Sequence, residues 1–172
     1  MKYLLLACAT ALVVISCNKE QTLDVPLNRT QKLYGNNKTD AAPEMPTRWT
    51  TKEYRVVFTK LDGSDSVVTD LQTACKKDDF LQFFENYSGK HHTANDKCST
   101  GEGDIYNFRW EFSDNDDSLN FYNCDRYFDY RTFKVSVKDF SDGEFTIAYP
   151  APFIVNNVPV DTVRIEHVFQ KN

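Results

Sequence analysis

Apolar and polar residues alternate along much of the chain, and this period of two is the feature that most constrains the fold. In residues 105–112, Tyr106, Phe108, Trp110 and Phe112 alternate with polar or charged neighbours. Successive side chains of an extended chain point to opposite faces, so the pattern predicts a strand with one apolar face. Further strands are expected at 54–58, 66–69, 80–86, 118–124, 133–138, 144–149 and 160–170, which makes about eight strands.

Short polar segments join these strands. Residues 61–64, 114–117 and 141–143 have turn compositions, and Pro150 blocks continuation of the strand before it. No convincing amphipathic helix separates the strands, so parallel βαβ units are not expected. An antiparallel meander of this length protects its edges and buries one face by closing. We therefore expect an all-β fold, an antiparallel up-and-down barrel of about eight strands, with a β-sandwich as the alternative.

The first 17 residues have the features of an export signal. Lys2 precedes an apolar run from Leu4 to Ile15, which is too short to span a membrane stably. The segment resembles a bacterial lipoprotein signal peptide whose lipobox is Val14-Ile15-Ser16-Cys17. The resemblance implies cleavage after residue 16 and attachment of lipid, such as palmitate, to Cys17. Asn18 is not the aspartate that retains lipoproteins in the inner membrane, so we expect an outer-membrane lipoprotein, periplasmic or surface-exposed.

A second lipobox match ends at Cys8, but cleavage there would leave an apolar segment of only about five residues. We therefore expect a signal peptide at 1–16. Residues 17–48 are polar beyond the lipidated cysteine and have few large apolar residues, which predicts a disordered tether. Residues 49–172 then form one barrel domain of ordinary size.

The charge balance excludes some partners. Removing residues 1–16 lowers Lys+Arg from 20 to 19 against 25 Asp+Glu, a net charge of 19 − 25 = −6. Nucleic acids and anionic membrane surfaces require basic patches, so neither is expected as a partner. The expected membrane contact is the N-terminal lipid, and the expected state is a monomer.

A motif in the middle of the chain carries a family resemblance. Residues 75–83, Cys-Lys-Lys-Asp-Asp-Phe-Leu-Gln-Phe, resemble the signature of the lipocalin-like domains of Gram-negative lipoproteins. Gly89, Cys98 and Trp110 follow in the family's order, and Trp49 supplies the earlier tryptophan strand. The resemblance covers about residues 49–170 and implies a lipocalin-like barrel. It implies little about activity, because most members have none assigned. The segment Lys90–Gly103 departs from the family as a long insertion-like loop.

Export places the remaining cysteines in an oxidising compartment. A disulfide between Cys75 and Cys98 would close a loop of about 23 residues and could add roughly 3 kcal/mol. We favour it over pairings with Cys124, which would then be a buried free thiol. A three-cysteine zinc site is disfavoured because no C-x-x-C pair is present.

Other titratable residues have ordinary explanations. His91 and His92 are expected as an exposed loop pair, because neighbours on an extended chain point apart and chelate a metal poorly. Asp114–Asp117 lack the glycine and terminal glutamate of a calcium loop, which favours a solvated hairpin tip. The carboxylates of Asp78 and Asp79 are expected to accept hydrogen bonds from the backbone of a cap or turn. His167 is expected near the barrel mouth, hydrogen-bonded to a neighbour.

No catalytic motif is present, and the sequence predicts no enzyme, cofactor or metal site. We expect a binding module for a small apolar ligand, contacted by Tyr106, Phe108, Trp110 and His167. The alternative is a filled barrel that binds another envelope protein through Lys90–Gly103 or Arg126–Arg131.

Overall fold

The computed structural model describes residues 27–37, 46–69, 72–113, 115–128, 132–151 and 160–172. These residues contain two short α-helices, α1 (Arg29–Tyr34) and α2 (Asp125–Phe128), and one 3₁₀ turn, η1 (Ala74–Lys76). The rest of the regular structure is one antiparallel sheet. Its strands are β1 (Trp49–Lys60), β2 (Asp65–Val68), β3 (Phe80–Phe83), β4 (Ser88–His92), β5 (Ile105–Phe112), β6 (Ser118–Tyr122), β7 (Thr132–Phe140), β8 (Glu144–Pro150) and β9 (Val160–Lys171).

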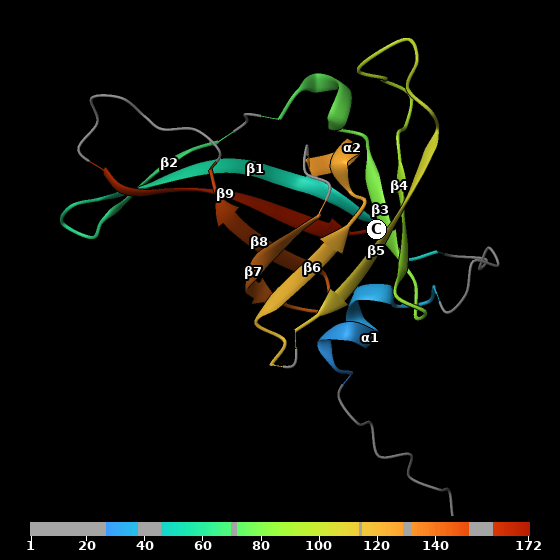
Figure 1. Ribbon diagram of the computed structural model, residues 1–172, viewed down its shortest axis with the longest axis horizontal. Coiled ribbons are helices and arrows are strands. Elements are labelled where there is room, and N and C mark those ends of the chain that lie inside the picture. The colour runs from blue at the N-terminus through green and yellow to red at the C-terminus, as the bar shows by residue number, and fades with distance from the viewer. Residues whose placement is uncertain (1–26, 38–45, 70–71, 114, 129–131, 152–159) are drawn as a thin grey trace, which may run out of the picture.

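The sheet closes into a barrel. Its order is β2-β1-β3-β4-β5-β6-β7-β8-β9, and β1 also pairs with β9 along nearly its whole length, from Trp49 opposite Lys171 to Lys60 opposite Val160. Eight strands, β1 and β3–β9, therefore form a closed antiparallel ring. The ninth, β2, pairs with the distal part of β1, and Figure 1 shows this hairpin projecting beyond the ring. The all-β, eight-strand barrel expected from the sequence is confirmed.

The alternation of side chains sorts residues between the interior and the solvent. On β5, Phe108 and Trp110 are buried, whereas Arg109 between them and Glu111 after Trp110 are exposed. The side chains that β8 and β9 contribute to the core are odd-numbered, among them Phe145, Ile147 and Ile165, and Phe145 lies opposite Phe169. The inward faces predicted from the period of two are confirmed for these strands.

Helix α1 closes one end of the barrel, as Figure 1 shows. Asn28 caps it: its Oδ1 accepts from the Gln31 backbone N–H, and the Gln31 side chain accepts from the Asn28 backbone N–H. Leu33 is fully buried, and its carbonyl accepts a hydrogen bond from the Trp49 indole at 2.7 Å. The prediction of a disordered tether up to residue 48 is therefore wrong for residues 28–37.

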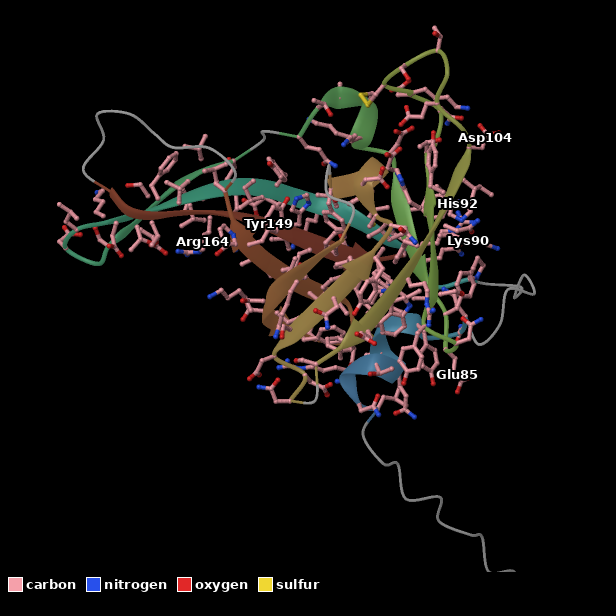
Figure 2. The ribbon with its side chains drawn as sticks, viewed as in Figure 1. Glu85, Lys90, His92, Asp104, Tyr149 and Arg164 are labelled. Atoms are coloured by element: carbon pink, nitrogen blue, oxygen red, sulfur yellow. A yellow bond between two sulfur atoms is a disulfide. The ribbon has the colours of Figure 1, made fainter. Side chains whose placement is uncertain are left out.

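The segment after α1 is fixed to the barrel as well. Asn37 is fully buried, and its side chain exchanges two hydrogen bonds with the backbone of Thr47, at 2.6 and 3.0 Å. Its carbonyl accepts from the Glu85 backbone N–H, and Figure 2 shows Glu85 beside α1. Residues 17–26 and 38–45 of the expected tether lie outside the described residues, as does the predicted signal peptide.

Strand β4 was not predicted. Its sequence, Ser-Gly-Lys-His-His, has no alternating apolar residues, yet it pairs with β5 over all five positions and with β3 over four. Gly89 is required there, because a Cβ atom would lie 2.2 Å from the ring of Phe108 on the neighbouring strand. The expected loop at Lys90–Gly103 therefore begins only after His92. The eight strands expected from the sequence included β2, which lies outside the ring, and omitted β4, which is part of it.

Candidate functional site

The barrel interior is filled at the end that α1 covers. Trp49 packs edge-on against Phe145 with ring centroids 4.8 Å apart, and Phe145 stacks on Phe169 at 4.7 Å. Phe83 lies between them and Trp110, whose ring centroid is 5.3 Å away. These side chains are almost wholly buried, so they form the core and leave no room for a ligand in this half.

A cavity of about 430 Å³ lies in the interior at the other end. Its volume falls within the range of small-molecule sites in proteins. The lining residues come from β1, β8, β9, α2 and the η1 region: Tyr54, Gln72, Thr73, Cys75, Lys76, Cys98, Tyr127, Phe128, Tyr149 and His167.

A larger hollow of about 530 Å³ lies elsewhere, and its lining includes the exposed Arg109 and Glu111 of β5. Within it, the Tyr122 hydroxyl donates to Glu111. None of its lining side chains carries a buried polar atom without a hydrogen-bond partner. We therefore place the candidate site in the interior cavity.

His167 is the most informative residue of this cavity. It is 5% exposed, and its Nε2 lies 2.9 Å from the Tyr149 hydroxyl. Burial, assisted by the charge of Lys76, lowers the pKa of His167 to about 3, so the imidazole is neutral at pH 7. Its Nδ1 is buried and has no hydrogen-bond partner. In Figure 2, Tyr149 lies away from the α1 end of the barrel.

Helix α2 separates the cavity from the filled half of the barrel. Its Phe128 is 5.3 Å from the His167 ring, centroid to centroid, and 5.0 Å from that of Phe121 in the core. The hydroxyl of Tyr127 lies 2.5 Å from Thr51 Oγ1, and burial raises the pKa of this phenol. Both aromatic residues are therefore held rigidly at the inner surface of the cavity.

The rim of the cavity is covalently fixed. A disulfide joins Cys75 of η1 to Cys98, as predicted, and both cysteines line the cavity. Lys76, the next residue, donates from Nζ to the Tyr127 carbonyl at 3.2 Å. Cys124 is a buried free thiol, as expected, and burial raises its pKa.

A second polar pair is buried in the interior. His91 is 2% exposed, and its Nε2 lies 2.9 Å from Asp79 Oδ2. Asp79 Oδ1 also accepts from the Ala94 backbone N–H, and Asp78 accepts from the Asn95 backbone N–H, so the two carboxylates bond the loop after β4 rather than a local turn. The prediction that the two histidines form an exposed loop pair is wrong, because both lie on β4. His92 stacks on Phe80.

The remaining metal candidates have ordinary surroundings. His91 and His92 do not converge on one site, in accordance with the expectation for neighbours in a strand. In the hairpin loop after β5, the Asn115 side chain donates to Asp117, and Asp114 lies outside the described residues. Within the described part of the chain, no three His, Cys, Asp or Glu side chains are grouped to hold a metal ion.

The four residues predicted to contact a ligand have different positions. His167 lines the cavity, whereas Phe108 and Trp110 lie in the filled half. Tyr106 stacks near His91, and its hydroxyl accepts from the Gly103 backbone N–H at 2.6 Å. Cys17 lies outside the described residues. Sequence patterns did not identify Tyr54 and Phe128 as wall residues, although Tyr54 lies in the strand expected at 54–58.

Comparison with known proteins identifies no relative: no family model, curated protein or solved structure matches this chain. The lipocalin-like resemblance therefore stays a prediction. None of the helices described is both long and apolar enough to cross a membrane.

Proposed function

We propose that this protein is a non-catalytic binding module that holds a small, largely apolar molecule in the cavity at the open end of its lipocalin-like barrel. One observation carries the proposal. A cavity of about 430 Å³ is lined by four aromatic side chains and by His167, whose buried Nδ1 has no hydrogen-bond partner, although buried polar atoms in proteins are nearly always hydrogen-bonded. A bound molecule would bury the surrounding rings.

The arrangement of the barrel supports binding rather than a purely structural role. One half is filled by rings, and α2 keeps that packing separate from the cavity. The disulfide and the Tyr127–Thr51 hydrogen bond hold the cavity walls in place before any ligand arrives. A preformed site of this kind reduces the entropy lost on binding.

The proposal is tested by blocking the cavity. Thr73 is exposed at the rim and lines the cavity, and its side chain makes no capping hydrogen bond. In a fluorescence titration with the neutral naphthalene dye prodan, Thr73→Trp is expected to weaken binding at least tenfold. The matched control Thr100→Trp changes an exposed residue that does not line the cavity, and it is expected to bind as the original protein does. Equal binding by both variants would contradict the proposal.

We further propose that the module is anchored in the outer membrane by lipid on Cys17. The lipobox at residues 14–17 and the short apolar run before it support this proposal. Cells fed radioactive palmitate are expected to label the protein, and Cys17→Ala should abolish the label. Cys8→Ala is the matched control and should leave the label intact. Labelling that depends on Cys8 instead would reject the assignment.

A further inference from the structure

A second hollow lies beside β5 and shares no lining residue with the interior cavity. Its volume is about 530 Å³, and it is lined by Tyr87, Arg109, Trp110, Glu111, Phe112 and Tyr122. We call it the β5 hollow, because most of its lining belongs to that strand. The pairing of β4 with β5 stops at Arg109, whereas the pairing of β6 with β5 continues to Phe112. Within the described residues, the end of β5 therefore has a paired strand on one side only, and the hollow lies at this end.

A strained turn presents Tyr87 at the edge of the β5 hollow. The residue immediately precedes β4, and its φ of 61° lies in the left-handed region. Glycine and asparagine adopt this conformation readily, whereas bulky side chains rarely do. The Tyr87 side chain is nevertheless 48% exposed, and its ring lies 5.5 Å from that of Trp110, centroid to centroid. A half-exposed aromatic ring held against its backbone preference is typical of a residue that contacts a ligand.

Polar side chains of β5 and β6 lie together in the same hollow. Arg109 is directly opposite Tyr122, and Glu111 follows two positions along β5, so the three side chains share one face of the sheet. The Tyr122 hydroxyl donates to Oε1 of Glu111, which leaves Oε2 of this carboxylate as a further acceptor. Arg109 is exposed and makes no hydrogen bond or ion pair with another described residue. Its N–H donors are therefore available to a ligand.

These groups select the ligand class. Among the six lining residues, the charges of Arg109 and Glu111 balance, so neither an anion nor a cation is favoured. A guanidinium only donates hydrogen bonds and a carboxylate only accepts them, whereas a sugar hydroxyl does both. The C–H face of a sugar ring also packs well on an aromatic ring, whose face is electronegative. A wholly apolar ligand would instead desolvate Arg109 and Glu111 without giving them partners.

We infer that the β5 hollow binds a neutral saccharide, which stacks on Tyr87 and hydrogen-bonds to Arg109 and Glu111. The volume of the hollow is within the range of small-molecule sites. This site goes beyond the proposed function of the interior cavity and does not depend on it, because the two share no residue. A sugar held on a half-exposed ring is expected to exchange rapidly and to be lost during purification.

Calorimetric titration of the purified protein with neutral trisaccharides tests the inference. The probes are cellotriose, maltotriose, laminaritriose, mannotriose and N-acetylchitotriose, and at least one of them is expected to bind. Tyr87→Asn should weaken that binding at least tenfold, although asparagine suits the left-handed conformation and should preserve the turn. Circular dichroism checks that this variant is folded. Tyr87→Phe keeps the aromatic face and is expected to retain most of the affinity.

A second pair of variants tests the polar contacts. Arg109→Met should weaken binding of the same sugar at least tenfold, because it removes the donors. Lys134→Met is the matched control, since it removes a positive charge from an exposed residue of β7 outside the hollow, and it should bind as the original protein does. Thr73→Trp, which blocks the interior cavity, should also leave sugar binding unchanged.

Three results would overturn the inference: no binding of any of the five sugars, binding that survives both Tyr87→Asn and Arg109→Met, or binding that is lost in Thr73→Trp. The last result would place the sugar in the interior cavity instead. Prodan titration of the original protein and Thr73→Trp tests the proposed function separately, so failure of one proposal is distinguishable from failure of the other.

Discussion

Two imidazoles, those of His91 and His167, are buried in this barrel with an Nδ1 that has no hydrogen-bond partner, and His167 is the one that lines the cavity. In the filled half, the inward residues are almost all hydrocarbon rings, whose packing needs no hydrogen bonds. In the open half, His167 is buried with one nitrogen bonded to Tyr149 and the other unpaired. An unsatisfied buried polar group typically costs about 1–3 kcal/mol, so the unpaired nitrogen of this cavity residue supports the proposed binding function.

The neutral state of His167 predicts an acid-sensitive fold. Its pKa is lowered to about 3 in the folded protein, against about 6.5 in an unfolded chain. Below pH 6.5 the unfolded state binds a proton that the folded state does not. The free energy of unfolding should therefore fall as the pH is lowered from 6.5 towards 3, by at most about 1.4 kcal/mol per pH unit from this residue.

Urea unfolding at a series of pH values measures this dependence. His167→Gln is expected to flatten it between pH 6.5 and 3. The pKa of His92 is lowered to about 4, chiefly by burial, so this residue contributes to the pH dependence of stability over a narrower pH range. His92→Gln should therefore flatten the curve only between pH 6.5 and about pH 4. An unchanged slope in His167→Gln would mean that this histidine is not buried in its neutral form.

Gly89 provides a test of the packing on β4. Gly89→Ala is expected to destabilise the fold by about 1–3 kcal/mol, because the added methyl group would overlap the Phe108 ring. Gly101→Ala is the matched control, since a Cβ atom there meets nothing within 4 Å. Urea unfolding of the two variants gives the comparison. Equal stabilities would place Phe108 away from Gly89.

At the scale of elements, the sequence predicted strands well where packing alone sets the residue pattern. On β5 and β9, every second residue fills the interior, so the period of two was visible. Strand β4 contributes Gly89, which accommodates a neighbouring ring, and His91, which pairs with Asp79, so its alternation carries no apolar signal. Helix α1 was missed because six residues show no helical period, although Asn28 and Gln31 form a capping box in the sequence.

The role of α1 is tested by removing its buried side chain. Leu33→Ala is expected to lower the free energy of unfolding by about 3 kcal/mol, because Leu33 is fully buried against the barrel. Leu27→Ala, at a leucine 56% exposed just before the helix, should have an effect of less than about 0.5 kcal/mol. Chemical denaturation measures both. If Leu33→Ala is as mild as Leu27→Ala, the segment is a tether after all.

At the scale of the whole molecule, closure of the sheet determines where a ligand can enter. Helix α1 covers one end, and Trp49 hydrogen-bonds to its backbone, so access is confined to the opposite end. The sequence predicted the barrel and the Cys75–Cys98 disulfide from local pattern. The site required long-range information: Tyr54 and His167 are 113 positions apart and meet because β1 pairs with β9, and Lys76 and Phe128 reach the cavity from η1 and α2.

The central claim is that the open half of the barrel carries a ligand site. Native mass spectrometry of the protein purified from an oxidising compartment tests it most directly, with the denatured mass as reference. We predict a reproducible extra mass of a small organic molecule that is lost on denaturation and absent from Thr73→Trp. An identical extra mass on Thr73→Trp, or a clean mass for the original protein even after incubation with prodan, would contradict the account.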